Sequence, residues 1–191
     1  MSSKLDNYSD TELYKLMAKH KSSSEAAFGE LYSRYNQRIY AYCLRVTGSH
    51  DDANDIFQEV FVKFYSSASE SKPIEKIPGY LMTIARNLCI NYNRDKKEYT
   101  NIENMNLRSN DDGLESKELM DLIIRSLECL EFNIREAFVL RMIQGFSYEE
   151  ISEITKTKAT VVKNQVYRAK EKIKEILQPI VEDLEKLDLI K

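Results

Sequence analysis

Residues 146–174 read FSYEEISEITKTKATVVKNQVYRAKEKIK, and this stretch decides the fold of the C-terminal half. Ser147, followed three residues later by Glu150, has the pattern of a capping box, which predicts a short helix that begins after Ser147. Residues 155–174 then hold seven Lys or Arg side chains and one Glu. Their apolar positions recur at helical spacing: Ala159, Val162, Val166, Ala169, Ile173 and Leu177. The stretch therefore predicts two helices joined by a turn at Lys156 to Lys158, the second with one apolar and one polar face.

Two interpretations of the second helix stay open on these residues alone. A lysine-rich face is often only a solvated surface. A short capped helix followed by a basic one also has the geometry of a helix-turn-helix, whose second helix enters the major groove of DNA. The side chains that point away from the apolar face are Thr160, Asn164, Tyr167, Arg168 and Glu171, with Lys163, Lys170 and Lys174 at its edge. They would read base edges and hold phosphates.

The rest of the chain also has helical periodicity, which predicts an all-α protein. Gly (5) and Pro (3) are scarce among the 191 residues, and this scarcity disfavours a protein built on many tight turns. We expect helices after Ser9 (with Glu12 as capping partner), from near Ser22 (with Glu25) to Gly48, over 51–65, from Pro78, over 116–130, and from Asn133 (with Glu136) to before Gly145. Pro179 is expected to bend or end the last helix.

Residues 99–116, YTNIENMNLRSNDDGLES, show no period and are rich in Asn, Asp and Ser. We interpret them as a flexible linker between two small helical domains, 1–98 and 117–191. The formal net charge of -3 hides an uneven distribution, because residues 117–155 hold four basic and eight acidic side chains and residues 156–191 hold nine and six.

Several protein classes are excluded by what the sequence lacks. It has no apolar run near 18 residues, which predicts no membrane insertion, and its polar N-terminus predicts a cytoplasmic protein. Cys43, Cys89 and Cys129 are expected as small buried hydrophobes, not as a disulfide or zinc framework. His20 and His50 are isolated, and no nucleophile motif, Gly-rich phosphate loop or metal-ligand spacing is present. We therefore expect no enzymatic activity, no cofactor and no metal.

Two further segments carry polar faces, each with a plain alternative. In residues 49–65 the side chains of Asp52, Asp55 and Glu59 share the face opposite the aromatic core. Acidic residues in a first helical turn favour the helix dipole, which explains Asp52 but not Glu59, so the face could dock a basic protein surface. In residues 78–97 the side chains off the apolar stripe are Thr83, Arg86, Asn87, Asn91 and Arg94. Arg94, with Lys96 and Lys97, also stands where cations suit a helix C-terminus, so this polar face either ends the helix or faces nucleic acid. Tyr65 and Tyr80 are either core residues or stacking faces for unpaired bases.

Taken in order, these segments resemble the bacterial RNA polymerase sigma factors of the extracytoplasmic-function (ECF) type in the sigma-70 family. LYSRYNQRIYAYCLRVTGSHDDANDIFQEVFVKFY is similar to region 2.1–2.2, with Asp52-Ala53-x-Asp55-x-x-Gln58-Glu59-x-Phe61 as its acidic helix. IPGYLMTIARNLCINYNRDKK is similar to regions 2.3–2.4, and LECLEFNIREAFVLRMIQGFSYEEISEITKTKATVVKNQVYRAKEKI to region 4. The similarity covers about 28–98 and 123–177.

The resemblance implies a region 2 domain at 1–98, a region 4 domain at 117–191 and a role in promoter-specific initiation of transcription. It implies docking on the polymerase β′ clamp helices by Asp52, Asp55, Gln58 and Glu59. It implies capture of unpaired bases of the minus-10 element by Tyr80, Arg86, Asn87, Asn91 and Arg94, with loop 66–77. It implies duplex recognition of the minus-35 element by Lys158, Thr160, Lys163, Asn164, Tyr167 and Arg168. Further implied partners are the polymerase β flap and an anti-sigma factor.

Two other functions remain as alternatives, and three positions depart from the family pattern. The alternatives are a stand-alone helix-turn-helix regulator and a helical adaptor that uses the acidic face. Tyr80 stands where the family often has Trp. Lys156 and Thr157 stand where the turn usually has Gly and an apolar residue, so the turn must accommodate any residue of positive φ without glycine.

Overall fold

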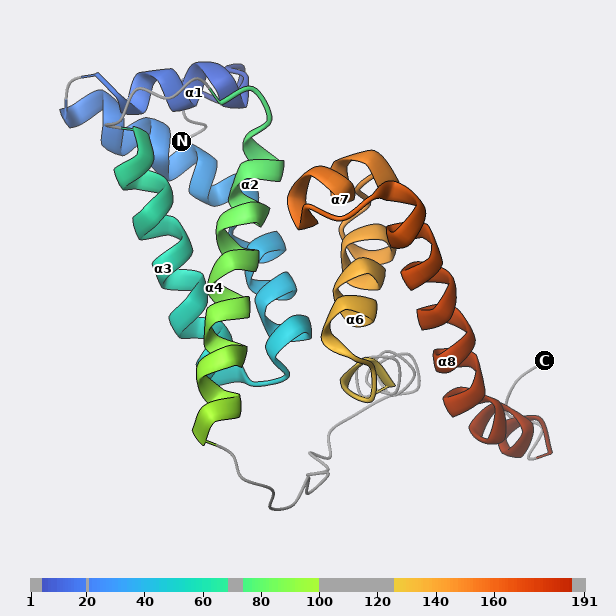
Figure 1. The fold of residues 1–191 in the computed structure, drawn as a ribbon. Coiled ribbons are helices and arrows are strands. Elements are labelled where there is room, and N and C mark those ends of the chain that lie inside the picture. Colours follow the sequence, from blue (N-terminus) through green and yellow to red (C-terminus); the bar gives the residue numbers. More distant parts are fainter. Residues whose placement is uncertain (1–4, 20, 69–73, 100–125, 187–191) are drawn as a thin grey trace. The chain divides into compact units, whose positions relative to one another are not determined.

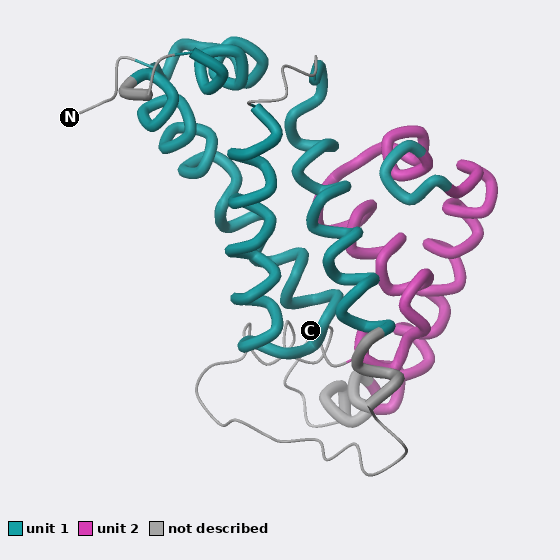
Figure 2. The backbone as a smooth tube through the Cα atoms, turned by 60° about the vertical axis from the view of Figure 1, so that its left-hand side comes forward, with its two compact units in different colours: residues 1–96, 153–156 teal, residues 97–152, 157–191 magenta. Residues whose placement is uncertain are grey.

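The computed structural model describes residues 5–19, 21–68, 74–99 and 126–186, and every regular element in these ranges is a helix (Figure 1). The chain divides into two compact units, residues 1–96 with 153–156 and residues 97–152 with 157–191 (Figure 2). The all-α class is thus confirmed. The predicted linker 99–116 lies outside the described residues except for Tyr99, which ends a helix. None of the helices in the described ranges is both long enough and apolar enough to cross a membrane.

The described part of the first unit contains four helices whose ends follow local signals. They are α1 (Asp10–Met17), α2 (Lys21–Thr47), α3 (His50–Ala68) and α4 (Ile77–Tyr99). The predicted capping box starts α1, because the Glu12 N–H donates to Ser9 Oγ at 3.3 Å and the Ser9 N–H donates to Glu12 Oε2 at 2.8 Å. Gly48 ends α2 with φ 73, a left-handed conformation that glycine adopts at little cost.

Two helix ends differ from the prediction. α2 begins at Lys21, so Ser22 lies inside its first turn and not at its cap. α3 continues past 65 to Ala68, because Ser67 and Ala68 are buried and prolong the face that packs on the unit. The burial of these two small side chains outweighs the polar composition that suggested an earlier end.

The core of the first unit is the meeting of apolar faces from its four helices. On α2 and α3 the buried residues include predicted positions: Leu31, Ile39, Tyr42, Val46, Ala53, Ile56, Val60, Phe61 and Phe64. For α4 the helical spacing predicts a buried stripe of Leu81, Ile84, Ala85, Leu88 and Tyr92. This prediction is partly wrong, because Leu81 and Ala85 are buried together with Met82 and Cys89, whereas Ile84, Leu88 and Tyr92 are half-buried. The helix is therefore rotated about its axis relative to the expected apolar stripe. Each fully buried large side chain contributes about 1.5–3 kcal/mol relative to an exposed one.

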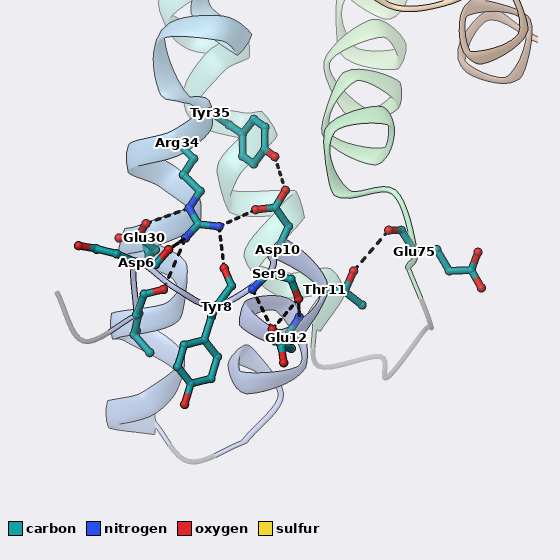
Figure 3. A network of polar contacts seen from close by, with 11 residues as sticks. Asp6, Tyr8, Ser9, Asp10, Thr11, Glu12, Glu30, Arg34, Tyr35 and Glu75 are labelled. Carbon is teal, nitrogen blue, oxygen red and sulfur yellow. Dashed lines mark hydrogen bonds and ion pairs between the residues drawn. The ribbon is translucent and has the colours of Figure 1, made fainter.

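A network centred on Arg34 of α2 holds the start of the chain and α1 in place (Figure 3). The Arg34 Nη1 donates to Asp10 Oδ1 at 2.8 Å and to the Tyr8 carbonyl at 3.0 Å. Its Nε donates to Glu30 Oε1 at 2.9 Å and its Nη2 to the Asp6 carbonyl at 3.1 Å. Burial lowers the pKa of Arg34, but the bonds and charges of Asp10 and Glu30 outweigh it, so the net pKa is raised. The guanidinium thus joins three chain segments as a permanent cation.

The second unit contains α6 (Phe132–Phe138), the π-helical turn η1 (Val139–Ile143), α7 (Tyr148–Thr155) and α8 (Ala159–Lys186). The last residues of α7, 153–155, and the following Lys156 group with the first unit. The predicted capping box of α7 is confirmed: the Ser147 N–H donates to Glu150 Oε2 at 2.8 Å and the Glu150 N–H to Ser147 Oγ at 3.1 Å. Gly145 ends the preceding segment with φ 77, as predicted.

Four expectations for this half were wrong or fall outside the described residues. α6 begins at Phe132 and its N-cap is Glu131, which makes no side-chain cap bond, so Asn133 is not its cap. The expected capping partner Glu136 is instead buried at 2% exposure, and Ile134 and Ala137 of the same helix are also buried. Cys129 is exposed, although Cys43 and Cys89 are buried as expected. Pro179 lies inside α8, which continues to Lys186, so the alternative that it ends the helix is wrong, while a bend at Pro179 stays a prediction. Of the predicted helix 116–130, only 126–130 are described.

Candidate functional site

The exposed face of α3 carries the predicted acidic residues. Asp55, Gln58 and Glu59 are exposed and Asp52 is half-buried. Glu59 Oε1 lies 3.1 Å from Lys63 Nζ, and both side chains are about half exposed (52% and 53%), so this ion pair contributes little to stability. The four predicted residues therefore share one accessible surface, but Lys63 offsets part of its negative charge. The described residues contain no group of three or more His, Cys, Asp or Glu side chains placed to hold a metal ion.

Sequence reasoning missed an apolar component beside this acidic face. Val62 is 64% exposed one helical turn beyond Gln58 and Glu59. It lines an open groove of about 440 Å³ together with Glu25, Phe28, Phe61, Tyr65 and Ser66. The aromatic spacing on α2 and α3 was visible in the sequence, but it was assigned wholly to the core. The accessible surface thus combines carboxylates with an apolar groove, which suits a protein partner better than a small ion.

Tyr65 belongs to this groove and packs against α2. Its ring centroid lies 5.1 Å from that of Phe28 in an edge-on arrangement, and its hydroxyl accepts a hydrogen bond from Ser24 Oγ at 3.2 Å. The Tyr80 ring lies 6.3 Å from Phe64 and is half-buried. Neither tyrosine is therefore a fully free stacking face, although both retain exposed surface.

The polar face of α4 follows the prediction in part. Asn87, Asn91 and Arg94 are exposed and recur at spacings of four and three, so they form one row along the helix. Arg86 is half-buried at the edge of this row. Thr83 Oγ1 donates to the Gly79 carbonyl at 2.8 Å, which occupies its hydroxyl within the helix. The row offers two amides and a guanidinium to a ligand, and Tyr80 lies two helical turns before its start.

The polar face of α8 matches the prediction and gains one residue. Lys158, Thr160, Lys163, Asn164 and Arg168 are exposed, and Tyr167 is 62% exposed. On the opposite side Val162, Val166 and Ala169 are at most 1% exposed. Val161 is 45% exposed beside Thr160, and sequence reasoning omitted it because a valine next to an apolar stripe is usually buried. The face thus combines cations, hydrogen-bonding side chains and one aliphatic side chain.

The turn before α8 uses a strained lysine in place of glycine. Lys156 has φ 56, a left-handed value that is uncommon for a residue with a Cβ. Lys158 then accepts hydrogen bonds at its carbonyl from the N–H groups of Val161 at 2.9 Å and Val162 at 3.1 Å, which starts α8. The turn therefore has the positive φ that glycine would supply, and it leaves Lys158 and Thr160 exposed at the start of the basic helix.

Contacts of the Arg141 side chain hold the residues at the start of α7. The Arg141 guanidinium lies 4.8 Å from the centre of the Tyr148 ring, and its Nη1 donates to the Phe146 carbonyl at 2.9 Å. Phe146 and Ile151 are 5% and 0% exposed, as expected for an apolar staple across the cap. The start of α7 and the turn before α8 are thus both set by local contacts.

Each half of the chain matches a known protein family. The sequence matches the family described as Sigma-70 region 2 over residues 31–99 and the family described as Sigma-70, region 4 over residues 120–173. The two matches together cover more than half of the chain. Because both halves match parts of one family in the same order, a stand-alone helix-turn-helix regulator is not favoured.

Relatives and solved structures extend this similarity over most of the chain. The ECF RNA polymerase sigma-E factor of Escherichia coli (strain K12) is 29% identical over 181 residues, which cover 87% of this chain and 94% of that protein. The ECF RNA polymerase sigma factor SigW of Bacillus subtilis (strain 168) is 28% identical over 175 residues, covering 84% and 94%.

Two solved structures share the fold. In one, the sigma factor RpoE from Bartonella quintana is in complex with the anti-sigma factor NepR (TM-score 0.66, 22% identity, 79% of this chain and 96% of that one). In the other, CnrH is in complex with the cytosolic domain of CnrY (TM-score 0.68, 21% identity, 89% and 97%). The chain belongs to the sigma-70 family and is an RNA polymerase sigma factor of the ECF type.

Proposed function

We propose that this sigma factor divides its work among three exposed helix faces, one each on α3, α4 and α8. The observation that carries the proposal is that each face is polar and accessible while the opposite side of the same helix is buried. Each helix is thereby held in its unit by one side and is available to a partner on the other. The faces differ in chemistry, and this difference assigns their partners.

The α3 face is proposed to bind core RNA polymerase, at the β′ clamp helices, through Asp52, Asp55, Gln58 and Glu59. Exposed carboxylates repel DNA phosphates and attract a basic protein surface, which favours fast and specific protein association. Val62 and the adjoining groove add apolar area that becomes buried on contact. A second contact of the same polymerase, with its β flap, is proposed for the C-terminal unit.

The α4 face is proposed to hold unpaired bases of the minus-10 element. Asn87 and Asn91 offer amides that pair with base edges, and Arg94 and Arg86 offer guanidinium groups for phosphates. Tyr80 supplies the exposed part of its ring for stacking, and the same ring packs against Phe64 of α3. Loop 66–77 is proposed to take part, and its residues 69–73 lie outside the described ranges.

The α8 face is proposed to read the minus-35 element as duplex DNA in the major groove. Thr160, Lys163 and Asn164 lie in the first turns of α8, and Lys158 lies directly before the helix. This is the part of a recognition helix that contacts base edges. Tyr167 and Arg168 lie one turn further and suit phosphates and the groove wall. Two units that bind two promoter elements on one DNA molecule raise each other's effective concentration, so weak individual contacts suffice.

Regulation and location follow the same assignment. Because one solved structure of similar fold is a sigma factor in complex with an anti-sigma factor, we include an anti-sigma factor among the partners of this chain. We also propose a cytoplasmic location, where polymerase and DNA are found, and a binding role without enzymatic activity of its own.

Reconstitution tests the proposal directly. The purified chain is combined with core RNA polymerase and a promoter from its own genome, and transcripts are mapped. We expect initiation that depends on both minus-10 and minus-35 elements. Failure of the chain to bind core polymerase would overturn the assignment, and tight binding to a palindromic duplex without polymerase would point to a stand-alone regulator.

Charge reversal tests the α3 face. Asp55→Arg with Glu59→Arg is expected to weaken core binding at least tenfold at low salt, because like charges then face the basic partner. Glu75→Arg is the control, since Glu75 is exposed but lies outside α3. Unchanged affinity of the double variant for core polymerase would refute docking by α3.

Truncation of one side chain tests the α8 face. Arg168→Ala is expected to weaken output from promoters that need the minus-35 element, because it removes a charged contact worth about 1–3 kcal/mol. Lys172→Ala is the control: Lys172 is an exposed cation on the same helix, paired with Glu175 at 3.0 Å. Equal output of the Arg168→Ala protein from promoters with and without the element would refute this role.

A further inference from the structure

Helix α1 contacts the chain on both sides of residues 69–73. It lies across the end of the first unit at which α3 ends and α4 begins (Figure 1). Its residues Leu13, Tyr14 and Met17 are at most 5% exposed, so it is packed into the unit. The match to region 2 begins at residue 31, so α1 lies outside the part of the chain to which that match applies.

The contact on the α3 side is a buried hydrogen-bond chain. The Tyr14 hydroxyl lies 3.0 Å from Ser67 Oγ, and Ser67 Oγ donates to the Phe64 carbonyl at 2.7 Å. Because the serine hydroxyl has one proton and gives it to Phe64, Tyr14 is the donor in the first bond. Tyr14 and Ser67 are 4% and 8% exposed, so loss of this bond leaves a buried polar group without its partner.

The contact on the α4 side is made one turn earlier on α1. Thr11 Oγ1 donates to the Glu75 carbonyl at 3.4 Å, just before α4 begins (Figure 3). This bond is exposed and long, so it guides the chain more than it stabilises it. Ring contacts strengthen the same connection: Tyr14 lies 5.5 Å from Phe64, and Phe64 lies 6.3 Å from Tyr80 in the first turn of α4.

Helix α1 is itself held in place by residues of α2. Asp10, at the start of α1, is bound by Arg34 at 2.8 Å, and it also accepts a hydrogen bond from Tyr35. α1 is thus fixed to α2 on one side and to the ends of α3 and α4 on the other. Glu59 lies eight residues before Ser67 on α3, about 12 Å along the helix axis, so the carboxylates of the proposed core-binding face lie away from these contacts, although the groove residues Tyr65 and Ser66 directly precede Ser67.

We propose that α1 is a positioning element for the minus-10 interaction, with Tyr14 as its central residue and Thr11 as its second contact. It sets where the chain leaves α3 and enters α4, and through Phe64 it sets the placement of Tyr80. This inference rests on the proposed role of α4, and it adds residues that the family resemblance does not assign. Its consequence is selective: α1 acts on promoter opening and not on core binding or minus-35 recognition.

The test compares Tyr14→Phe with Thr11→Val, alone and combined, against Tyr8→Phe. The first change removes the hydroxyl and keeps the ring, so the variant is expected to fold. Tyr8→Phe removes an exposed hydroxyl from the same N-terminal segment. The affinity of each protein for core polymerase is measured first. The complex with core polymerase is then used to measure two more affinities, for a minus-35 duplex and for a single-stranded minus-10 oligonucleotide. Permanganate reactivity of minus-10 thymines reports opening on an intact promoter.

We expect the double variant to lose about fivefold or more in minus-10 affinity and in opening, with core and minus-35 affinities within about twofold. Tyr8→Phe should match the unmodified protein throughout. A merely destabilised first unit would lose core affinity and minus-10 affinity in the same proportion, and that result would overturn the inference. Wild-type behaviour of the double variant would overturn it as well. If the unmodified protein bound core but failed to hold the minus-10 oligonucleotide, the proposed role of α4 would fail instead.

Discussion

The Arg34 guanidinium donates to the Asp10 carboxylate at 2.8 Å and so joins α2 to α1. Both side chains are 25% exposed, so the pair is shielded from solvent more than a surface ion pair but is not sealed in the core. The same guanidinium nitrogen also bonds the Tyr8 carbonyl at 3.0 Å. One side chain therefore fixes both the helix and the segment that leads into it.

Replacing Arg34 by methionine is expected to destabilise the first unit by about 1–3 kcal/mol, because charge-assisted hydrogen bonds are lost while the apolar stem remains. The measurement is the free energy of unfolding from urea titration. Lys63→Met is the control, since the pair of Lys63 with Glu59 is about half exposed and its loss should cost less than about 0.5 kcal/mol. Equal losses for the two variants would show that the Arg34 network adds nothing beyond a surface pair.

The same network makes stability depend on alkaline pH through Tyr35. Burial raises the pKa of the Tyr35 phenol, and its hydrogen bond to Asp10 raises the pKa further above the ordinary value of 10.0. The folded protein therefore holds this proton more tightly than the unfolded chain. The resulting stabilisation is complete below pH 10.0 and is lost as the pH rises through the raised folded-state pKa. Tyr35→Phe should thus reduce the fall in unfolding free energy between about pH 9 and pH 11. Parallel pH profiles for the two proteins would contradict this.

Features set by neighbouring residues in the sequence were predicted well. The caps at Ser9 and Ser147 are confirmed, because a capping box needs only residues three apart. The apolar and polar faces of α8 are confirmed for the same reason, since periodicity alone separates Val162 from Lys163. The three candidate surfaces were therefore visible in the sequence, although their partners came from the family resemblance.

Features set by distant residues were not predictable in this way. The bond of Arg34 to Asp10 spans 24 residues, and that of Tyr14 to Ser67 spans 53. The rotation of α4, which buries Met82 and leaves Ile84 and Leu88 half-buried, depends on the shapes of the helices it packs against. The groove at Val62 and Tyr65 likewise exists only once α2 and α3 are side by side. Local pattern carries no information on such pairings.

The left-handed Lys156 gives a prediction about the helix-turn-helix. With φ 56 its Cβ is strained, and Lys156→Gly removes this strain at the cost of a more flexible unfolded chain. We expect a net stabilisation of the C-terminal unit of up to about 1 kcal/mol. The measurement is again the unfolding free energy of the protein without DNA.

Lys163→Gly is the matched control, because Lys163 is also an exposed lysine close to the turn but lies inside α8 and is not among the described residues of positive φ. Glycine there should give no gain and should cost up to about 1 kcal/mol. A loss of stability in the Lys156→Gly protein equal to that of the control would mean that the left-handed turn is not a source of strain.

Val161 and Val162 separate binding from stability, because the same residue type occupies the two sides of α8. Val161 is 45% exposed on the proposed DNA face, and Val162 is fully buried. Val162→Ala is therefore expected to destabilise the C-terminal unit by about 1–3 kcal/mol through lost burial and a residual cavity. Val161→Ala should change stability by less than about 0.5 kcal/mol. It should instead weaken transcription from minus-35-dependent promoters about fivefold, since an aliphatic side chain in the major groove contacts thymine methyl groups.

Both quantities are measured on each variant, unfolding by urea titration and promoter output by transcript yield with core polymerase. If Val161→Ala left promoter output unchanged at full stability, Val161 would have no part in the DNA contact. If the two variants were equally destabilised, the orientation of α8 that places Val162 inward and Val161 outward would be wrong.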